Sequence, residues 1–258
     1  MTKVKDIKLS AALAVFNEEE NIMDCLLSLK AFVDEIVVVD GNSRDRTAQL
    51  AKNLGAKVIS TTNKTMFHIN KNMAIENCSG DWILLMDADE RISKQLAAEI
   101  KNKIKENPKE NGFWINRKNW FLGGFLNKGG AYPDSVIRLF RRGKGRLPEI
   151  SVHEQVKIDG SIGQINADIL HLADPSFYRY LMRANRYTSQ TAAKFEREKI
   201  GKNPLVFAYF TTIKPFTTFL KIYLRHKGYE DGFRGFVWAL FSGSHFFISY
   251  VKYWTKDK

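Results

Sequence analysis

Short apolar runs alternate with segments of helical periodicity over the first 90 residues of the chain. Four runs of strand length, each bounded by polar or glycine residues, occupy positions 7–16, 36–39, 58–59 and 82–86. Between them apolar residues recur every three or four positions, which is typical of helices with one buried face. Strands and helices in regular alternation predict a parallel sheet built from βαβ units with right-handed crossovers.

The boundaries of these elements carry local signals. Asn17, with Glu20 three positions later, resembles a capping box and predicts that the first helix starts there. Gly55 ends the second predicted helix, and Ser93 is a suitable N-cap for the helix after the fourth strand. A further helix is expected from about residue 65 to residue 77, before the fourth strand.

The fourth strand ends in two carboxylates separated by one residue. The run 82–86 is entirely apolar, which predicts a strand buried on both faces, and Asp87 and Asp89 follow at its tip. In extended backbone these side chains point the same way, and converging carboxylates repel unless a cation lies between them. Mg²⁺ or Mn²⁺ is the expected cation, since both accept oxygen ligands. The alternative is that both acids only favour the start of the next helix.

An aromatic and glycine-rich stretch lies in the middle of the chain. Residues 113–115 are expected to begin another strand, and residues 119–130 are expected to form a loop. Trp114 and Trp120 have flat apolar faces that suit sugar rings, although both also fit an ordinary core. Residues 138–142 alternate as a strand does, and their arginines are candidates for phosphate contact.

The positive charge of the protein is concentrated in its last third. Residues 1–174 hold 25 Lys and Arg against 23 Asp and Glu, whereas residues 175–258 hold 15 against 5. This last third has two aromatic-rich helical segments, at 205–224 and 233–253, interrupted by prolines. A basic and aromatic helical region predicts contact with an anionic membrane surface. The alternative is a helical subdomain packed on the catalytic core or on another subunit.

The sequence also limits the compartment and the chemistry. The N-terminus lacks the apolar run of a secretory signal, no window predicts a transmembrane helix, and Cys25 and Cys78 are isolated, which is consistent with a reducing cytoplasm. Neither a Gly-x-Gly-x-x-Gly loop nor a Walker loop is present, which disfavours hydride transfer and ATP hydrolysis of those types. Polar residues instead follow three strands, where ligands bind in parallel sheets.

Four ordered motifs resemble the family 2 glycosyltransferases with the GT-A fold. These motifs are Leu13–Glu19, Ile36–Thr47, Lys71-Asn72 and Gly80–Glu90. A longer set resembles the bacterial enzymes that add a sugar to the lipopolysaccharide inner core, typically β-1,4-glucosyltransferases. That set comprises Tyr132–Asp134, Arg138–Arg142, Val152–Glu154, His171 and Asp231-Gly232. The chain departs from many relatives at Asp40-Gly41, where they have two acids, and at Ala14, where they often have proline.

The resemblance implies an α/β fold of the GT-A type, a Rossmann-like, mostly parallel sheet flanked by helices. The catalytic domain is expected over residues 1–174, with a nucleotide-sugar-binding half at 1–106 and an acceptor-binding half at 107–174. Residues 175–258 are expected to form the C-terminal helical region that associates with the membrane.

The resemblance also implies a role for each candidate site residue. The residues expected around the nucleoside are Ala14, Phe16, Glu18 and Asp40, and those near the diphosphate are Lys71 and Asn72. Asp89 is expected to hold the metal, and Asp87 to reach the ribose or the metal. Glu154 is the expected catalytic base, with Glu90 as the second choice, and His153 or His171 is a candidate third metal ligand.

The expected activity is an inverting, metal-dependent transfer of a hexose from a nucleotide-sugar, with a UDP-hexose as donor. The acceptor is a glycolipid or oligosaccharide, and the enzyme is expected in the cytoplasm, peripheral on the inner face of the cytoplasmic membrane; an oligomer is compatible with the sequence. One rival is a transferase of the same fold that loads sugar onto a polyprenyl phosphate, and a nucleotidyltransferase is a weaker one. A basic nucleic-acid-binding protein is disfavoured, because Asp87 and Asp89 would repel phosphate without a metal.

Overall fold

The computed structural model describes residues 7–150, 154–174 and 176–256, and these form two compact units. The first unit comprises Met1–Arg117 and Asp134–His171, and the second comprises Lys118–Pro133 and Leu172–Lys258. Residues 118–133 therefore group with the C-terminal helices, whereas the sequence analysis included them in an N-terminal domain ending at residue 174. The roles assigned to the two parts of the chain stay predictions.

The first unit is built on a mixed sheet whose first four strands are parallel. These strands are β1 (Leu9–Val15), β2 (Glu35–Asp40), β3 (Lys57–Ser60) and β4 (Trp82–Met86), as the apolar runs predicted. The sheet continues with β5 (Glu90–Ile92), β6 (Gly112–Phe121), β8 (Asp134–Arg141), β11 (Ile162–Gln164) and β12 (Ile169–Asp174). A short strand, β7 (Gly124–Phe125), pairs with the end of β6 and belongs to the second unit. The main path of the sheet runs β3-β2-β1-β4-β8-β6-β12-β5, and β9 (Gly145–Arg146) pairs separately with β10 (Lys157–Ile158).

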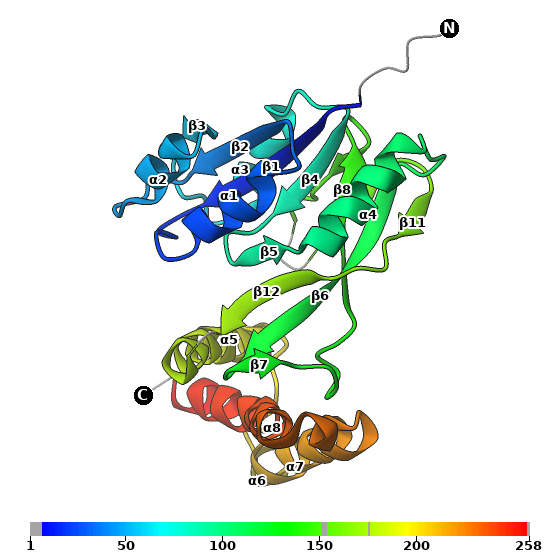
Figure 1. The fold of residues 1–258 in the computed structure, drawn as a ribbon. Helices are drawn as coiled ribbons and strands as arrows, with labels where there is room; N and C mark the ends of the chain where they lie inside the picture. Colours follow the sequence, from blue (N-terminus) through cyan, green and yellow to red (C-terminus); the bar gives the residue numbers. More distant parts are fainter. Residues whose placement is uncertain (1–6, 151–153, 175, 257–258) are drawn as a thin grey trace, which may run out of the picture. The chain divides into compact units, whose positions relative to one another are not determined.

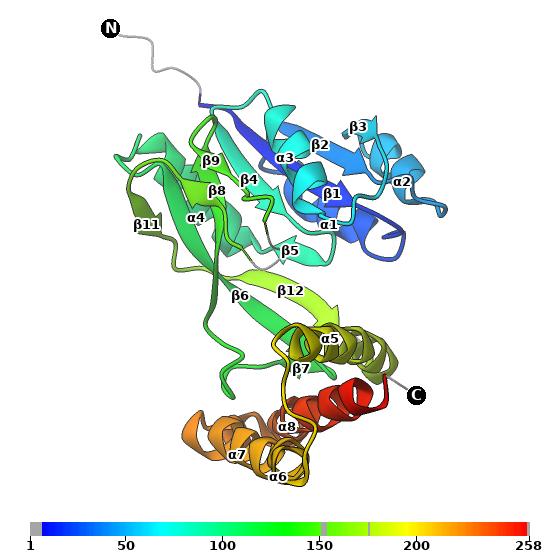
Figure 2. The same ribbon diagram turned by 180° about the vertical axis from the view of Figure 1, so that it is seen from behind.

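Helices cover both faces of the parallel strands (Figures 1 and 2). They are α1 (Ile22–Lys30), α2 (Thr47–Asn53), α3 (His68–Glu76) and α4 (Lys94–Lys105). Apolar residues of α1, α2 and α4 share one core with one face of the sheet, whereas α3 packs in a second core on the other face. All five residues of β4 are buried, which confirms the prediction that both of its faces are covered.

Two local predictions at helix starts have opposite outcomes. Ser93 caps α4, because its hydroxyl accepts a hydrogen bond from the Leu96 amide over 3.1 Å. The capping box at Asn17 is wrong, since α1 begins only at Ile22 and without a side-chain cap. Asn17 has a φ of 54°, and its side-chain oxygen accepts from the Arg44 amide instead, so a contact with a distant loop overrides the local signal.

The expected loop at residues 119–130 is in part a β-hairpin, so that prediction is wrong for its first residues. β6 continues to Phe121 and pairs with β7, with Trp120 opposite Phe125. The two rings also meet edge to face, with centroids 4.9 Å apart. Aromatic side chains favour paired strands, and the turn itself is confined to Leu122-Gly123, both with positive φ.

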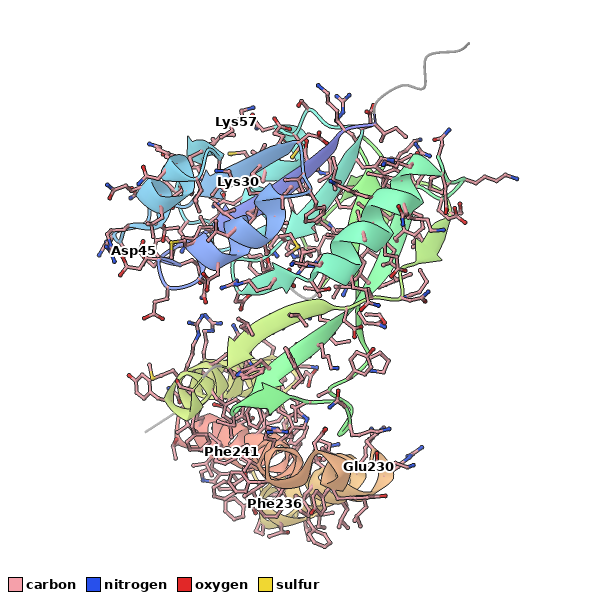
Figure 3. The ribbon with its side chains drawn as sticks, viewed as in Figure 1. Lys30, Asp45, Lys57, Glu230, Phe236 and Phe241 are labelled. Atoms are coloured by element: carbon pink, nitrogen blue, oxygen red, sulfur yellow. The ribbon has the colours of Figure 1, made fainter. Side chains whose placement is uncertain are left out.

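The second unit is a layered helical assembly. Its helices are α5 (Phe177–Arg197), α6 (Pro204–Ala208), α7 (Lys214–Leu220) and α8 (Gly232–Thr255), with π-helical turns at Tyr209–Ile213 and Lys221–Arg225 and a short 3₁₀ turn at Gly228–Asp231. The long helix α8 packs against α5 on one side and against α7 on another (Figure 3). Phe241 of α8 contacts Phe177 and Tyr180 of α5, whereas Phe236 contacts Phe219 of α7.

The hairpin segment 118–133 is attached to these helices by apolar packing and by hydrogen bonds to one carboxylate. Phe121 and Leu126 share a core with Tyr180 of α5 and Val237 of α8. The Asp231 carboxylate accepts hydrogen bonds from the backbone amides at 127 and 128, over 3.1 and 2.8 Å. The motif Asp231-Gly232 therefore has a structural task in this unit. No helix among the described residues is both long enough and apolar enough to span a membrane.

We expect Gly235→Ala to destabilise the helical unit, because a Cβ at position 235 would lie 1.8 Å from the backbone oxygen of Gly228. Backbone cannot move aside as a flexible side chain does, so the cost should be about 3 kcal/mol or more. Thermal unfolding followed by circular dichroism should show a midpoint lower by about 6–12 °C. Gly201→Ala is the control, since its nearest neighbour is the end of the Asn203 side chain, and an unchanged midpoint for Gly235→Ala would contradict the expectation.

Candidate active site

The carboxyl ends of three neighbouring parallel strands bring the predicted site residues to one edge of the sheet. β1 lies between β2 and β4, with Val15 opposite Asp40 and Leu13 opposite Met86. The segments that follow these strands therefore begin side by side. In parallel sheets this edge is where ligands bind, because loops and helix starts converge there.

The loops after β1 and β2 are joined by backbone-to-side-chain hydrogen bonds. The Asn17 amide donates to Ser43 Oγ over 2.9 Å, and the Glu18 amide donates to Thr47 Oγ1 over 2.7 Å. Glu18 itself accepts from the Asn21 side chain over 2.8 Å. These bonds fix the two loops to each other before any ligand is present.

Asp40 is 3% exposed and organises the loop after β2. Its carboxylate accepts from the Ser43 amide over 3.0 Å and from the Ser43 hydroxyl over 2.5 Å. A side chain at position 41 would be crowded, because a Cβ there would lie 3.1 Å from Cα of Asn63. In this structure Asp40 is a turn-forming residue, and its contact with a nucleoside stays a prediction.

The other residues expected around the nucleoside lie along the end of β1. Ala14 is half-buried, and Phe16 is 38% exposed although it is a large apolar side chain. Glu18, two residues after Phe16, is also half-buried. An exposed aromatic ring at the ligand-binding edge of a sheet is suited to stacking on a planar base.

The chain turns sharply after β4, so the expected extended geometry of the two acids is wrong. The Glu90 amide donates to the Asp87 carbonyl over 3.0 Å, which closes a turn over Asp87–Glu90. The Asp87 amide in turn donates to Glu90 Oε2 over 2.9 Å. Asp87 and Asp89 consequently have different neighbours, and each acid has its own partner.

Asp87 is held by two cations. Lys71 Nζ lies 2.5 Å from its Oδ1, and the Arg138 guanidinium lies 2.5 Å from its Oδ2. The same guanidinium nitrogen is 2.6 Å from Glu90 Oε1. Burial by itself would raise the pKa of Asp87, but the charges of Arg138 and Lys71 hold that pKa well below its ordinary value. Asp87 is therefore ionised.

Glu90 is fully buried and acts as a support for the turn. One of its oxygens accepts from the Asp87 amide and the other faces Arg138, while Arg117 lies 3.7 Å away. Arg138 was expected only as a candidate for phosphate contact, whereas it is buried between two carboxylates. A charged residue between Ile137 and Leu139 in an apolar strand was the signal for a buried ion pair.

Asp89 lies beside a histidine from the other end of the first unit. His171 Nε2 is 3.4 Å from Asp89 Oδ2, because β12 pairs with β5 and aligns His171 with Glu90. Burial raises the pKa of Asp89, but the hydrogen bond and charge of His171 outweigh it and lower the pKa overall. Both side chains remain partly exposed. The alternative ligand His153 lies outside the described residues.

A carboxylate and an imidazole at this separation form a donor set that Mn²⁺ accepts. Asp87 is a poorer ligand in this structure, since both of its oxygens already contact cations. No group of three or more acidic, histidine or cysteine side chains is gathered for a metal within the part of the chain that is described. The pair Asp89 and His171 therefore fits a cation that completes its shell with ligand oxygens.

Lys71 and Asn72 are neighbours on α3 but have different contacts. Lys71 reaches Asp87, whereas Asn72 is 2% exposed and points to the segment before residue 150. Its amide exchanges two hydrogen bonds with the backbone of Leu147, over 2.9 and 3.0 Å, and donates to Glu149 over 2.8 Å. Asn72 thus supports residues 147–149, and its assignment to the diphosphate stays a prediction.

Glu154 is half-buried and lies outside any helix or strand. The next residue, Gln155, accepts a hydrogen bond from the Ile137 amide over 3.3 Å. Ile137 precedes Arg138 in β8, so the chain around Glu154 runs beside the strand that supplies the buried guanidinium. This position is compatible with Glu154 as the catalytic base, and that role stays a prediction.

Comparison with known proteins agrees with this architecture. Residues 10–131 match the model of the family described as "Glycosyl transferase family 2". A relative from Rhizobium meliloti, "Lipopolysaccharide core biosynthesis glycosyltransferase LpsC", is 27% identical over 98% of this chain and 94% of its own. An uncharacterized glycosyltransferase of Rickettsia typhi is 28% identical over 89% of this chain and 81% of its own.

Two solved structures share the fold. The mannosyltransferase PcManGT from Pyrobaculum calidifontis, in complex with GDP-Man and Mn²⁺, has a TM-score of 0.54 at 14% identity and covers 98% of this chain and 88% of that one. TarS 1-349 of S. aureus, in complex with UDP-GlcNAc, has a TM-score of 0.50 at 15% identity, with 93% and 81% covered. The predicted fold class and enzyme class are confirmed. The chain is a glycosyltransferase of the GT-A fold, and its residues 10–131 form a glycosyl transferase family 2 domain.

Proposed function

We propose that the protein transfers a hexose from a UDP-hexose to a saccharide of the lipopolysaccharide inner core. The observation that carries the proposal is the Asp89–His171 pair beside the Asp87 ion cluster at the carboxyl end of β4. Support for the acceptor comes from the printed function of the Rhizobium relative, which aligns with almost the whole chain. Support for a nucleotide-sugar donor comes from the two solved neighbours, whose complexes contain GDP-Man and UDP-GlcNAc.

The donor is held by the ends of β1 and β2 and by the site after β4. Phe16, with Ala14 and Glu18, borders the base, and Asp40 shapes the loop that faces the ribose. Asp87, kept ionised and oriented by Lys71 and Arg138, accepts hydrogen bonds from a ribose hydroxyl. Lys71 supplies positive charge near the diphosphate.

Asp89 and His171 are the residues that would hold Mn²⁺ or Mg²⁺, with Mn²⁺ favoured by the imidazole nitrogen. When bound, such a cation neutralises the charge that develops on the leaving diphosphate. This assignment is narrower than a pair made of Asp87 and Asp89. It leaves Asp87 to the ribose, because Lys71 and Arg138 already balance its charge, while each of its oxygens keeps a lone pair that can accept from a hydroxyl.

Glu154 serves as the base in a single displacement. It takes the proton from the acceptor hydroxyl while that oxygen forms a bond to the anomeric carbon. The bond from the anomeric carbon to the diphosphate oxygen breaks in the same step, so the configuration inverts and the transition state is oxocarbenium-like. Glu90 is unsuited to this task, since it is buried and bonded to Arg138.

The acceptor and donor are tested together by a screen of nucleotide-sugars with Mg²⁺ or Mn²⁺. We expect UDP release from a UDP-hexose to rise when inner-core glycolipid is added, with a new glycosidic bond detected by mass spectrometry. Polyprenyl phosphate is the comparison acceptor. Transfer to polyprenyl phosphate but not to the core saccharide would overturn the proposed acceptor, and release of pyrophosphate would overturn glycosyl transfer itself.

Asp89→Ala and His171→Ala should each weaken Mn²⁺ binding in the presence of UDP by about 10–100-fold or more, because each removes one of two protein ligands. Titration of Mn²⁺ by electron paramagnetic resonance measures this directly, without turnover. Asp159→Asn is the control, since that carboxylate is exposed and forms a salt bridge with Lys144. Unchanged Mn²⁺ affinity in both site variants would contradict the ligand assignment.

Glu154→Gln should lower kcat by about 10²–10⁴-fold, because an amide cannot accept the acceptor proton. The dissociation constant for the UDP-sugar, measured by calorimetry, should stay within about twofold, since the base does not hold the donor. Glu106→Gln, on the exposed end of α4, is the matched control. Normal turnover in Glu154→Gln with donor still bound would remove Glu154 from the mechanism.

Arg138→Met should destabilise the protein by about 3–5 kcal/mol, because the fully buried Glu90 would lose the cation that it shares with the half-buried Asp87. The stabilising contribution of a carboxylate with a lowered pKa is present at neutral pH and is lost as the pH falls through that pKa. The difference in thermal midpoint from the wild type should therefore narrow only below about pH 4. Arg146→Met, which removes an exposed ion pair with Glu76, should cost at most about 1 kcal/mol.

A further inference from the structure

The second unit carries a stripe of large apolar side chains that its own helices leave exposed. From Pro204 to Arg225 the chain is continuously helical through α6, α7 and the two π-helical turns. The members of this outer stripe are Leu205, Tyr209, Ile213, Phe216 and Leu224; Phe207 is also partly exposed, but its ring contacts Tyr250 and Trp254 of α8. Leu205 is 84% exposed and Phe216 is 62% exposed. Scattered exposed apolar residues are ordinary, but five on one helix mark a surface that meets an apolar medium.

The inner side of the same helical segment is the side that packs on α8. Phe210 stacks on Tyr250 of α8, with ring centroids 5.0 Å apart, and Phe219 meets Phe236 edge to face. At Gly243 the backbone of α8 comes so close that a Cβ would lie 2.5 Å from the Pro215 carbonyl oxygen. These contacts occupy one side of the segment, so the outer stripe faces away from α8.

The spacing of the outer stripe matches the wider turns of this segment. The first three members, Leu205, Tyr209 and Ile213, are four residues apart, and Phe216 follows three residues later. A π-helical turn takes more residues than an α-helical turn, so positions four apart remain on one side there. Pro215, which has no backbone N–H, follows the first π-helical turn and ends a local hydrogen-bond ladder. The irregular helix therefore keeps the apolar side chains in line.

The charge within the segment that carries the outer stripe is entirely positive. Residues 199–229 contain six Lys and Arg and no Asp or Glu. Lys214 and Arg225 directly follow Ile213 and Leu224, and Lys221 lies between them in sequence. Side chains of this kind lie along apolar surface with their stems and extend the charged group to its border. The chemistry of the surface is an apolar centre edged by cations.

We propose that the outer stripe is the surface by which the protein docks on an anionic phospholipid bilayer. The apolar side chains enter the boundary between headgroups and acyl chains, and the exposed Lys221 and Arg225 meet lipid phosphates, whereas Lys214 lies over the Phe246 ring of α8. A second copy of the chain is a poorer occupant, because two such segments would bring their like charges together, and residues 199–229 hold no acid to balance them. The inference deepens the proposed function, since an inner-core acceptor is anchored in lipid.

Vesicle cosedimentation of the full chain tests the proposal. Wild type should bind vesicles of phosphatidylglycerol and phosphatidylcholine and should bind pure phosphatidylcholine far less. The double variant Ile213→Glu/Phe216→Glu should bind the anionic vesicles about thirtyfold or more weakly. Lys221→Gln/Arg225→Gln should lose about fivefold for each charge removed. The matched control is Met23→Glu/Leu27→Glu, which alters two equally exposed apolar residues of α1 and should leave binding unchanged.

A labelled variant reports insertion directly. Cys25 and Cys78 are both buried, so a cysteine introduced by Ile213→Cys can be labelled selectively with an environment-sensitive dye. Its emission should shift to the blue with anionic vesicles, whereas a dye placed by Leu27→Cys should not respond. Binding that is unaltered in Ile213→Glu/Phe216→Glu, or a dye at 213 that stays in water, overturns the proposal. The proposal is also overturned if light scattering without vesicles shows that the wild type is a dimer and that the double variant is a monomer.

Different results would contradict the proposed docking surface and the proposed catalysis. If glycosyl transfer is wrong, wild type shows no UDP release with the delipidated core saccharide, while vesicle binding and its loss in Ile213→Glu/Phe216→Glu are unaffected. If the docking surface is wrong, the double variant binds vesicles as wild type does. Support for both requires that the double variant lose vesicle binding and keep wild-type turnover of the delipidated saccharide, which also shows that it is folded.

Discussion

A single buried guanidinium determines the geometry at the end of β4. Arg138 lies between Asp87 and Glu90 and contacts both within 2.6 Å. Without that cation, two carboxylates in a tight turn would repel and would be costly to bury. With it, the turn can be closed by its own backbone and by the Glu90 side chain, which leaves Asp89 directed to His171. The separate environments of the two aspartates thus follow from one residue on the adjacent strand.

The same arrangement explains why the site is ordered before a ligand arrives. Hydrogen bonds between the loops after β1 and β2 fix one side of the edge, and the ion cluster fixes the other. Helix α3 contributes to two parts at once, since Lys71 reaches Asp87 while Asn72 carries the segment at 147–149. Preorganised polar groups of this kind reduce the rearrangement needed during a reaction.

Much of the fold was accessible from sequence because periodicity and buried strand runs are local properties. The four parallel strands, their helices and the Ser93 cap follow from such patterns. The failures involve tertiary partners: Asn17 was misassigned because its partner is the Arg44 amide, and the 119–121 segment because strand pairing outweighed its glycine-rich surroundings. The edge of the site was predicted from strand ends, but the partners of Asp87 and Asp89 were not, since Arg138 and His171 lie about 50 and 80 residues further along the chain.

The grouping of residues 118–133 with the C-terminal helices determines which truncated forms of the protein can fold. A polypeptide ending at residue 174 would keep the hairpin and lose α5 and α8, against which Phe121 and Leu126 are buried. Phe121 and Leu126 would then be exposed to solvent, and the isolated fragment would be expected to aggregate through these apolar side chains. A soluble fragment of the first unit would require replacing residues 118–133 with a short polar connector as well as removing the tail.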